Sequence, residues 1–367
     1  MTAVMMVATA VMHAEGDGKE IFSMPKLSGY IIGQYQYSSQ EDEESNSFDL
    51  RLVRVSLTGR ILEDFEWRLQ AQANGSTETL GSSPRMVDMY VEWQKYKPFK
   101  VKFGQFKRPF TFENPINPID VGFMAYSQAV SKLSGFSDRT GERSSNGRDI
   151  GLQFQGDLLF NDAGRALLHY QIGIFNGQGI NNADADNQKD VIGGVWVSPI
   201  DGMRIGLFGW TGSYTREGTL TSDDGTEHDA EVTVDKRRYC ISAEYKHEDW
   251  EFRSEYIHST GYGFKVSENS DDGENDLTIN TAAGDKADGF YAMVSAPIKK
   301  YKAHIRGRYD LYRPRAEWGT SKTRYELQAN YLFNKYVSVT LEYALVNDRS
   351  LDHSNYSIID TQVNVRF

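Results

Sequence analysis

The sequence predicts an all-β protein, a transmembrane antiparallel β-barrel of about sixteen strands with a long third loop folded inward. Three observations favour this class. The segment Ser357–Phe367 alternates apolar and polar side chains without interruption and ends on an aromatic residue. Similar alternating segments recur along the chain. The connections between them are short and long in turn, which is typical of outer-membrane barrels with short periplasmic turns and long extracellular loops.

Each strand follows from its two-residue period. Successive side chains of a strand point to opposite faces, so Phe65–Asn74 gives one apolar and one charged face, whereas a helical period would scatter the charges around a cylinder. The same pattern predicts sixteen strands: Leu27–Tyr37, Leu52–Arg60, Phe65–Asn74, Val87–Gln94, Phe99–Phe106, Ile150–Leu158, Leu168–Phe175, Val191–Val197, Met203–Thr211, Arg238–Tyr245, Trp250–His258, Gly289–Ala296, Lys302–Tyr309, Tyr325–Phe333, Val337–Leu345 and Ser357–Phe367.

The connections predict the orientation of the barrel. Short turns include Ile61–Asp64, Lys95–Pro98, Pro199–Gly202, Lys246–Asp249, Pro297–Lys300 and Asn334–Tyr336. Long loops are predicted at Gln40–Ser47, Gly75–Pro84, Arg108–Asn146, Asn176–Asp190, Gly212–Lys236, Ser259–Ala287, Leu311–Thr323 and Asn347–Asn355. An even number of strands leaves both chain ends at the rim of short turns, which we predict to be periplasmic. Aromatic residues beside those turns fit a girdle at the membrane boundary.

Composition supports a membrane barrel in the bacterial outer membrane. The 367 residues are 25% charged, yet they include 21 tyrosines, 19 phenylalanines and 6 tryptophans. After residues 1–14, no segment approaches the roughly 18 apolar residues of a spanning helix. We predict a signal peptide over 1–14, whose true start can lie further upstream, a periplasmic segment over 15–26 and the barrel over 27–367. A short buried segment is the alternative for 1–14. The single Cys240 fits export and a wall-filling role.

The polar face of each strand predicts a water-filled lumen. In a closed barrel the apolar face meets lipid, and sixteen strands enclose more space than side chains fill. We predict that inward charged residues line the pore: Arg54, Arg68, Glu92, Lys102, Arg238, Arg253, Arg306 and Arg308. Two alternatives follow from their mixed signs. Either they form salt bridges along the wall, or a basic patch at Arg306 and Arg308 attracts anions.

The third long loop, Arg108–Asn146, exceeds ordinary loop length and carries several aromatic residues. Because these side chains favour burial, we predict that the loop folds into the lumen and narrows it; an external flap or partner-binding loop is the alternative. The predicted constriction residues are Lys107, Arg108, Glu113, Asn114, Arg139 and Arg143.

Three motifs in and around this loop resemble a known family. The run Gly104-Gln105-Phe106-Lys107-Arg108-Pro109-Phe110-Thr111-Phe112-Glu113-Asn114 resembles the strand-to-loop signature of the phosphate-selective porin O and P family, and Gly147–Leu152 and Gly173–Gly177 resemble its later signatures. The resemblance implies a sixteen-stranded homotrimeric barrel whose third loop shapes the eyelet, with basic residues inside the pore. The net charge of -11 and the many inward acids depart from a strongly basic lumen.

Other classes of function fit less well. The seven histidines show no zinc-binding spacing, and the sequence has neither a nucleophile elbow nor a phosphate-binding loop, so we predict no enzyme activity, metal or cofactor. The acidic loop segments are predicted to be solvated, with divalent-cation bridging as the alternative. We predict passive diffusion of small hydrophilic solutes or anions, contacts with outer-membrane lipid and lipopolysaccharide, and no nucleic-acid partner. The alternative is a plugged structural or adhesive barrel that docks a partner through its long loops.

Overall fold

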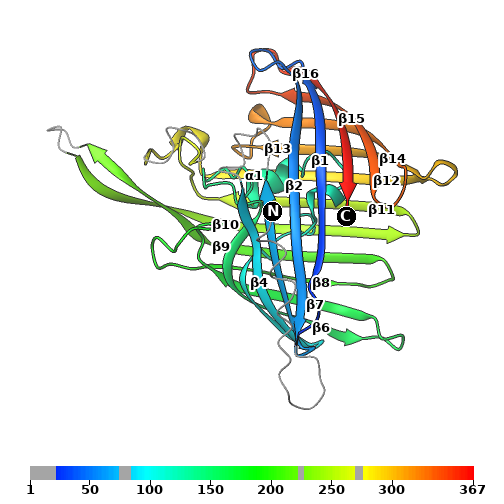
Figure 1. Ribbon diagram of the computed structural model, residues 1–367. Coiled ribbons are helices and arrows are strands. Elements are labelled where there is room, and N and C mark those ends of the chain that lie inside the picture. Colours follow the sequence, from blue (N-terminus) through cyan, green and yellow to red (C-terminus); the bar gives the residue numbers. More distant parts are fainter. Residues whose placement is uncertain (1–21, 74–83, 222–226, 269–275) are drawn as a thin grey trace, which may run out of the picture.

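The structure of the protein, a computed structural model, describes residues 22–73, 84–221, 227–268 and 276–367 (Figure 1). The predicted signal segment, most of the segment 15–26, nearly all of the loop Gly75–Pro84 and parts of two acidic loops lie outside these residues. The division into three segments therefore stays a prediction.

In the described part of the chain, sixteen antiparallel strands close into one barrel, which confirms the predicted fold class. Each strand pairs with its neighbours in the sequence, and β1 closes the ring against β16. The strands are β1 Lys26–Ser38, β2 Ser45–Ile61, β3 Phe65–Ala73, β4 Arg85–Tyr96, β5 Phe99–Lys107, β6 Arg148–Phe160, β7 Ala166–Phe175, β8 Asp190–Val197, β9 Met203–Thr221, β10 Glu227–His247, β11 Trp250–Thr260, β12 Lys286–Ile298, β13 Ala303–Arg313, β14 Lys322–Leu332, β15 Val337–Asp348 and β16 Asn355–Arg366.

The described helices are all short: η3 Pro118–Asp120, α1 Gln128–Leu133, η4 Thr281–Ala283, η5 Lys299–Tyr301 and η6 Trp318–Thr320. Among the residues that the structure describes, none of the helices is long and apolar enough to span a membrane.

The two faces of the strands differ as the alternation predicts. In β3, Leu69 is 38% exposed on the outer face, whereas Gln70 is 1% exposed on the inner face. Both described chain ends lie at the rim of short turns. Phe22 bridges to Ile61 beside the turn between β2 and β3, and the amide of Arg366 donates to the carbonyl of Tyr336 in the turn between β14 and β15, at 2.8 Å.

The prediction of a loop over Gly212–Lys236 is wrong for most of that segment. β9 and β10 continue as a paired hairpin that projects from the barrel in Figure 1. Tyr214 and Val234 on the hairpin pack with Phe264 of the next long loop, so this extension has a buried face of its own. The apolar alternation is weak there, since threonine and glycine interrupt it, and it gave no clear strand signal.

A β-bulge turns an additional arginine toward the lumen. The register between β1 and β2 shifts at Ile32 and Gly33, which pair with Leu52 and Leu50, so Arg51 is the extra residue. A bulge bends the strand and re-aims its side chains. Leu50 stays exposed on the outside, while Arg51, like Leu52 and Arg54, belongs to the inner face.

The loop between β5 and β6, residues 108–147 and here called loop 3, folds into the barrel and carries the main apolar core. Its short helix α1 contacts β11, β12 and β13 on the far wall. The buried cluster joins loop residues to an apolar part of the inner wall that the strand alternation alone does not mark: Phe110, Phe112, Val121, Tyr126, Ala129, Val130 and Leu133 against Phe106, Phe175, Ile192, Phe208, Trp210, Cys240, Ile257, Ala287 and Tyr312.

Candidate channel constriction

The three sequence motifs meet where loop 3 leaves and rejoins the wall. Arg108 pairs with Asp149 of β6 at 3.0 Å, and the amide of Gly177 donates to the same Asp149 carboxylate at 3.0 Å. The Asn114 side-chain amide donates to the carbonyls of Arg108 at 3.0 Å and Gly147 at 3.2 Å. Residues that are distant in the sequence therefore hold the two ends of loop 3 next to each other on the inner wall.

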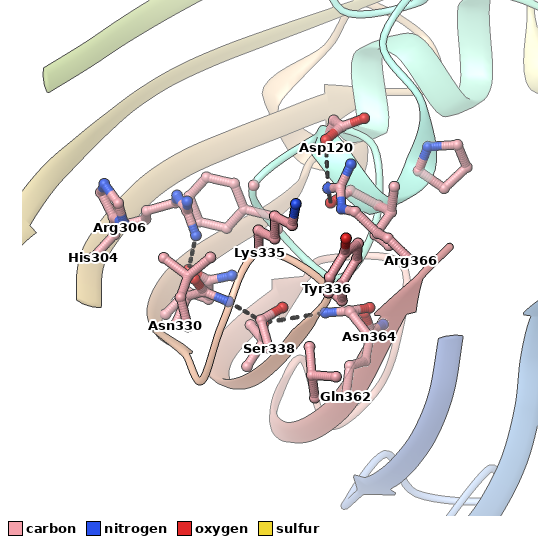
Figure 2. A pocket seen from close by; sticks show the side chains of 18 of the residues that line it. Asp120, His304, Arg306, Asn330, Lys335, Tyr336, Ser338, Gln362, Asn364 and Arg366 are labelled. Carbon is pink, nitrogen blue, oxygen red and sulfur yellow. Dashed lines mark hydrogen bonds and ion pairs between the residues drawn. The ribbon is translucent and has the colours of Figure 1, made fainter. Parts of the chain in front are cut away.

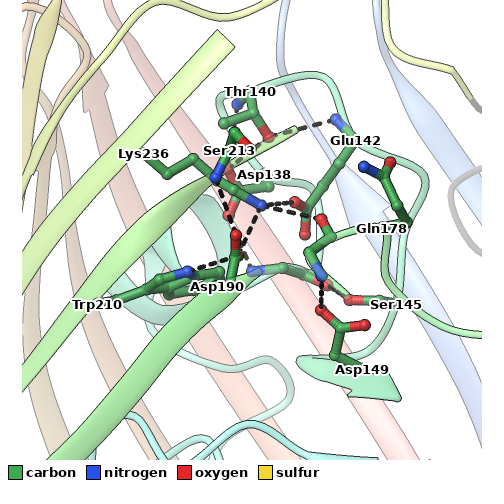
Figure 3. A network of polar contacts seen from close by, with 12 residues as sticks. Asp138, Thr140, Glu142, Ser145, Asp149, Gln178, Asp190, Trp210, Ser213 and Lys236 are labelled. Atoms are coloured by element: carbon green, nitrogen blue, oxygen red, sulfur yellow. Dashed lines mark hydrogen bonds and ion pairs between the residues drawn. The ribbon is translucent and has the colours of Figure 1, made fainter. Parts of the chain in front are cut away.

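A buried charge network holds the returning half of loop 3, the half that leads back to β6. The Lys236 ammonium of β10 lies 3.2 Å from Glu142 of loop 3 and 3.2 Å from Asp190 of β8, and Figure 3 shows these groups around one centre. Glu142 also pairs with Arg108 at 2.8 Å. Burial disfavours the charged form of Arg108, but Glu142 and Asp149 outweigh this effect and raise the pKa of its guanidinium.

A second buried ion pair holds the segment of loop 3 around Asp138, within its returning half. Arg238 of β10 donates to both carboxylate oxygens of Asp138, at 2.6 and 2.7 Å, and to the carbonyl of Leu133. Burial alone would raise the pKa of Asp138, but the charge and hydrogen bonds of Arg238 hold this pKa below its ordinary value. Asp138 is therefore a charged anchor for loop 3.

Aromatic side chains pack the outgoing half of loop 3, the half that follows β5, against β8 and β9. The Phe112 ring meets Trp196 at 5.6 Å and Phe208 at 5.4 Å between centroids, in edge-to-face geometry. The Phe110 ring meets Trp210 at 5.6 Å. Such pairs contribute about 0.5–1.5 kcal/mol beyond the burial of their area.

Acidic residues of the wall accept hydrogen bonds from the backbone of loop 3. Glu255 of β11 accepts from the amides of Phe112 at 2.6 Å and Glu113 at 2.8 Å. Asp310 of β13 accepts from the amide of Gln128, and Glu342 of β15 from that of Met124, each at 2.9 Å. Several inward acids thus bind loop 3 and are not free charges in the lumen.

The predicted pore-lining residues divide into two groups. Most are paired: Glu92 with Lys102 at 3.2 Å, Arg68 with Asp88 at 3.2 Å, Arg238 with Asp138, Arg253 with Glu251 at 3.2 Å, and Arg308 with Glu326. Arg253 and Arg308 also donate to loop 3 carbonyls. Their position fits the salt-bridge alternative. Arg54 and Arg306 differ, because among the described residues no carboxylate lies within ion-pair distance of either guanidinium.

The predicted constriction residues mostly hold loop 3 together. The Lys107 ammonium donates to the Tyr126 hydroxyl at 3.0 Å, and Glu113 accepts from the Ser127 hydroxyl at 2.7 Å. Arg139 donates to the carbonyls of Gly261 and Gly284, and Arg143 pairs with Glu268 of another long loop at 3.2 Å. Any role of these residues in selectivity stays a prediction.

Away from the packed core, the inner wall keeps a polar strip that is partly accessible to solvent. It includes Gln34 and Gln36 of β1, Arg51 of β2 and Arg324 of β14. Four arginines here, Arg51, Arg54, Arg85 and Arg324, each have at least one buried guanidinium nitrogen without a hydrogen-bond partner. Within the described part of the chain, none of the four forms an ion pair. We call them the arginine strip.

Sequence reasoning missed three members of this strip. Arg51 faces inward only because of the bulge, which leaves no mark in the alternation. Arg85 follows residues 74–83 at the very start of β4, where the periodic pattern has barely begun. Arg324 precedes the predicted start of its strand at Tyr325.

Comparisons with known proteins agree with this architecture. The family model for phosphate-selective porin O and P matches residues 29–192. The match confirms the family that the three motifs indicated. No curated protein matches the sequence.

Solved structures show the same fold at low identity. OmpF of Salmonella typhi, in complex with daunomycin, has 13% identity and a TM-score of 0.64, covering 94% of this chain and 97% of that one. OprB of Pseudomonas putida has 10% identity and a TM-score of 0.62, covering 94% of each chain. The channel DcaP of Acinetobacter baumannii has 10% identity and a TM-score of 0.60, covering 96% and 99%.

The protein is an outer-membrane porin. Its family match and its barrel place it in the bacterial outer membrane as a diffusion channel rather than as an enzyme of the envelope. In this porin the motif residues hold loop 3 in place, and the arginine strip supplies guanidinium groups that form no ion pair within the described residues. Within the described residues, no group of three or more histidine, cysteine, aspartate or glutamate side chains is arranged to hold a metal ion.

Proposed function

We propose that this porin passes small hydrophilic solutes and favours anions over cations. The arginine strip carries the proposal. Four guanidinium groups without an ion-pair partner face a partly accessible side of the lumen. The carboxylates of Glu255, Asp310 and Glu342 accept hydrogen bonds from the backbone of loop 3. Uncompensated arginines along a pore attract anions and repel cations over roughly a Debye length, about 10 Å at 0.1 M salt.

The test is the reversal potential of single channels in planar bilayers under a potassium chloride gradient, with and without phosphate. The wild type should give a chloride-to-potassium permeability ratio above one. The variant R51Q/R54Q/R85Q should lower this ratio, because it removes three positive charges and no ion pair. Arg237→Gln is the matched control, since Arg237 is exposed on the outer face of β10. An unchanged ratio in the triple variant would refute the role of the strip.

A second candidate function is a barrel that docks a partner, and the β9–β10 hairpin that projects from the barrel favours it (Figure 1). The same bilayers separate the two. Stepwise currents support the porin, whereas silent membranes that contain folded protein support the docking barrel.

We also propose a homotrimer within outer-membrane lipid and lipopolysaccharide. A trimeric form of OmpT from Vibrio cholerae, at 12% identity and a TM-score of 0.59 over 94% of this chain and 99% of that one, supports the proposal. Chemical cross-linking of the detergent-extracted protein, followed by mass determination, tests it. A single species at the mass of one chain would contradict it.

A further inference from the structure

A polar cavity of about 220 Å³ lies near the rim of short turns, between the tip of loop 3 and the inner wall of β13 to β16. Its floor comes from residues 118–123 of loop 3, and the turn between β14 and β15 borders it. Figure 2 shows the labelled side chains of both parts around this space. The cavity is separate from the arginine strip, because none of the four strip residues lines it.

Two cations of the cavity have no carboxylate partner among the described residues. Arg306 donates only to neutral groups, namely Ser295 Oγ at 3.1 Å and Gln328 Oε1 at 2.8 Å. The Lys335 ammonium lies 4.7 Å from the centre of the Tyr336 ring. By contrast, Arg366 at the same cavity is neutralised by Asp120 at 2.6 Å. The cavity therefore keeps a net positive charge.

Neutral groups add both donors and acceptors. Thr340 Oγ1 accepts hydrogen bonds from the side-chain amides of Asn330 at 2.9 Å and Asn364 at 3.4 Å, so its own hydroxyl proton is available to donate. Asn364 Oδ1 and His304 Nδ1 are buried atoms without a hydrogen-bond partner. Unpaired buried polar atoms cost free energy unless a ligand or water satisfies them.

The tip of loop 3 places Arg306 at the cavity. Gly122 has φ of +94°, a conformation that favours glycine, and a Cβ atom there would lie 3.3 Å from Cδ of Arg306. Glycine therefore lets the loop backbone pass over the arginine stem. The side chain of Arg306 consequently lies between loop 3 and the inner wall.

We propose that this cavity is a binding subsite for a small hydroxylated anion, such as a sugar acid, on the periplasmic side of the channel. Arg306 and Lys335 would bind the anionic group, and the free acceptor of Asn364 with the donor of Thr340 would bind hydroxyl groups. A simple inorganic anion would interact only with the two cationic side chains. A neutral sugar would form hydrogen bonds only with the amide and hydroxyl groups. The inference rests on the proposed porin function, because the solute would reach the cavity through the channel.

The test is calorimetric titration of the folded protein in detergent with gluconate. Wild-type protein should bind gluconate saturably, and Arg306→Gln or Lys335→Gln should each weaken binding roughly tenfold, the loss of about one charge-assisted hydrogen bond. Lys300→Gln is the matched control. Lys300 lies 5.2 Å from the Tyr301 ring in the neighbouring short turn, which repeats the Lys335 arrangement outside the cavity.

Comparison ligands test the chemical class. Acetate and glucose should each bind at least roughly tenfold more weakly than gluconate, since each lacks one half of the contacts. Equal binding of acetate would show that hydroxyl groups are not recognised, and equal binding of glucose would show that charge is not recognised. Either result, or no loss in R306Q and K335Q, overturns the proposal.

Bilayer recordings separate this inference from the proposed function. Gluconate added on the short-turn side should reduce the potassium chloride current of the wild type more than that of R306Q. Open channels in protein that does not bind gluconate would refute the subsite and leave the porin function standing. Gluconate binding by protein that forms no channels would refute the porin function and leave the subsite standing.

Discussion

Arg238 of β10 and Asp138 of loop 3 face each other inside the barrel as a forked ion pair, with Nη2–Oδ1 at 2.6 Å and Nη1–Oδ2 at 2.7 Å. Both side chains are fully buried. Because a forked pair fixes orientation as well as distance, it holds the returning half of loop 3 in one position. The position of loop 3 inside the barrel therefore depends on a contact between residues 100 positions apart in the sequence.

Arg238→Ala should release loop 3. Removal of one partner of a buried ion pair costs about 3–5 kcal/mol, because the other charge stays buried and unpaired. We expect a lower unfolding midpoint in urea and a noisier, larger single-channel conductance. Asp157→Asn is the control, since Asp157 pairs with Lys100 at 3.4 Å on a partly exposed wall and does not hold loop 3. Equal effects of the two variants would contradict the anchoring role.

The stabilising effect of Asp138 should persist into acid. Its folded pKa lies below the ordinary value, so its contribution is fully present above the unfolded pKa of about 3.9 and is lost only as pH falls through the lower folded pKa. The difference in unfolding free energy between wild type and D138N should thus stay constant from pH 7 to about 5 and shrink below about 4. A difference that already declines between pH 7 and 6 would argue against this assignment.

Phe112→Ala should loosen the outgoing half of loop 3. Truncation of a buried phenylalanine costs about 3–5 kcal/mol, and Phe112 is enclosed by Trp196 and Phe208. We expect faster cleavage of loop 3 by added protease and a larger conductance. Phe160→Ala, at a ring that is 41% exposed, should change neither quantity.

Spin labels along β3 should alternate between two environments. A label at Leu69 or Ala71 should favour collisions with oxygen, which concentrates in lipid, and a label at Gln70 or Gln72 should be shielded from oxygen inside the barrel. Cys240 is 1% exposed, so the native thiol should not compete for the label in folded protein. Equal accessibility at successive positions would contradict the barrel orientation.

The local alternation of side chains was enough to predict most of the strands. The lengths of the connections predicted the two rims, and the length and aromatic residues of loop 3 predicted its inward course. The period of two is a backbone property, so Phe65–Ala73 or Asn355–Arg366 shows its two faces without knowledge of the rest. The same reasoning failed for the β9–β10 hairpin, because Tyr214 and Val234 become buried only against Phe264 from a different loop.

By itself, the sequence determined that this chain forms a barrel with lipid on one face of each strand and polar side chains on the other. Only the tertiary structure decided which inward charges are free. Arg308 and Arg238 form ion pairs with residues on other elements. Arg51, which the bulge turns inward, and Arg306, which has neutral partners, form no ion pair within the described residues. The physical reason is that an electrostatic field depends on distances in space between charges, and these distances are set by how loop 3 crosses the lumen.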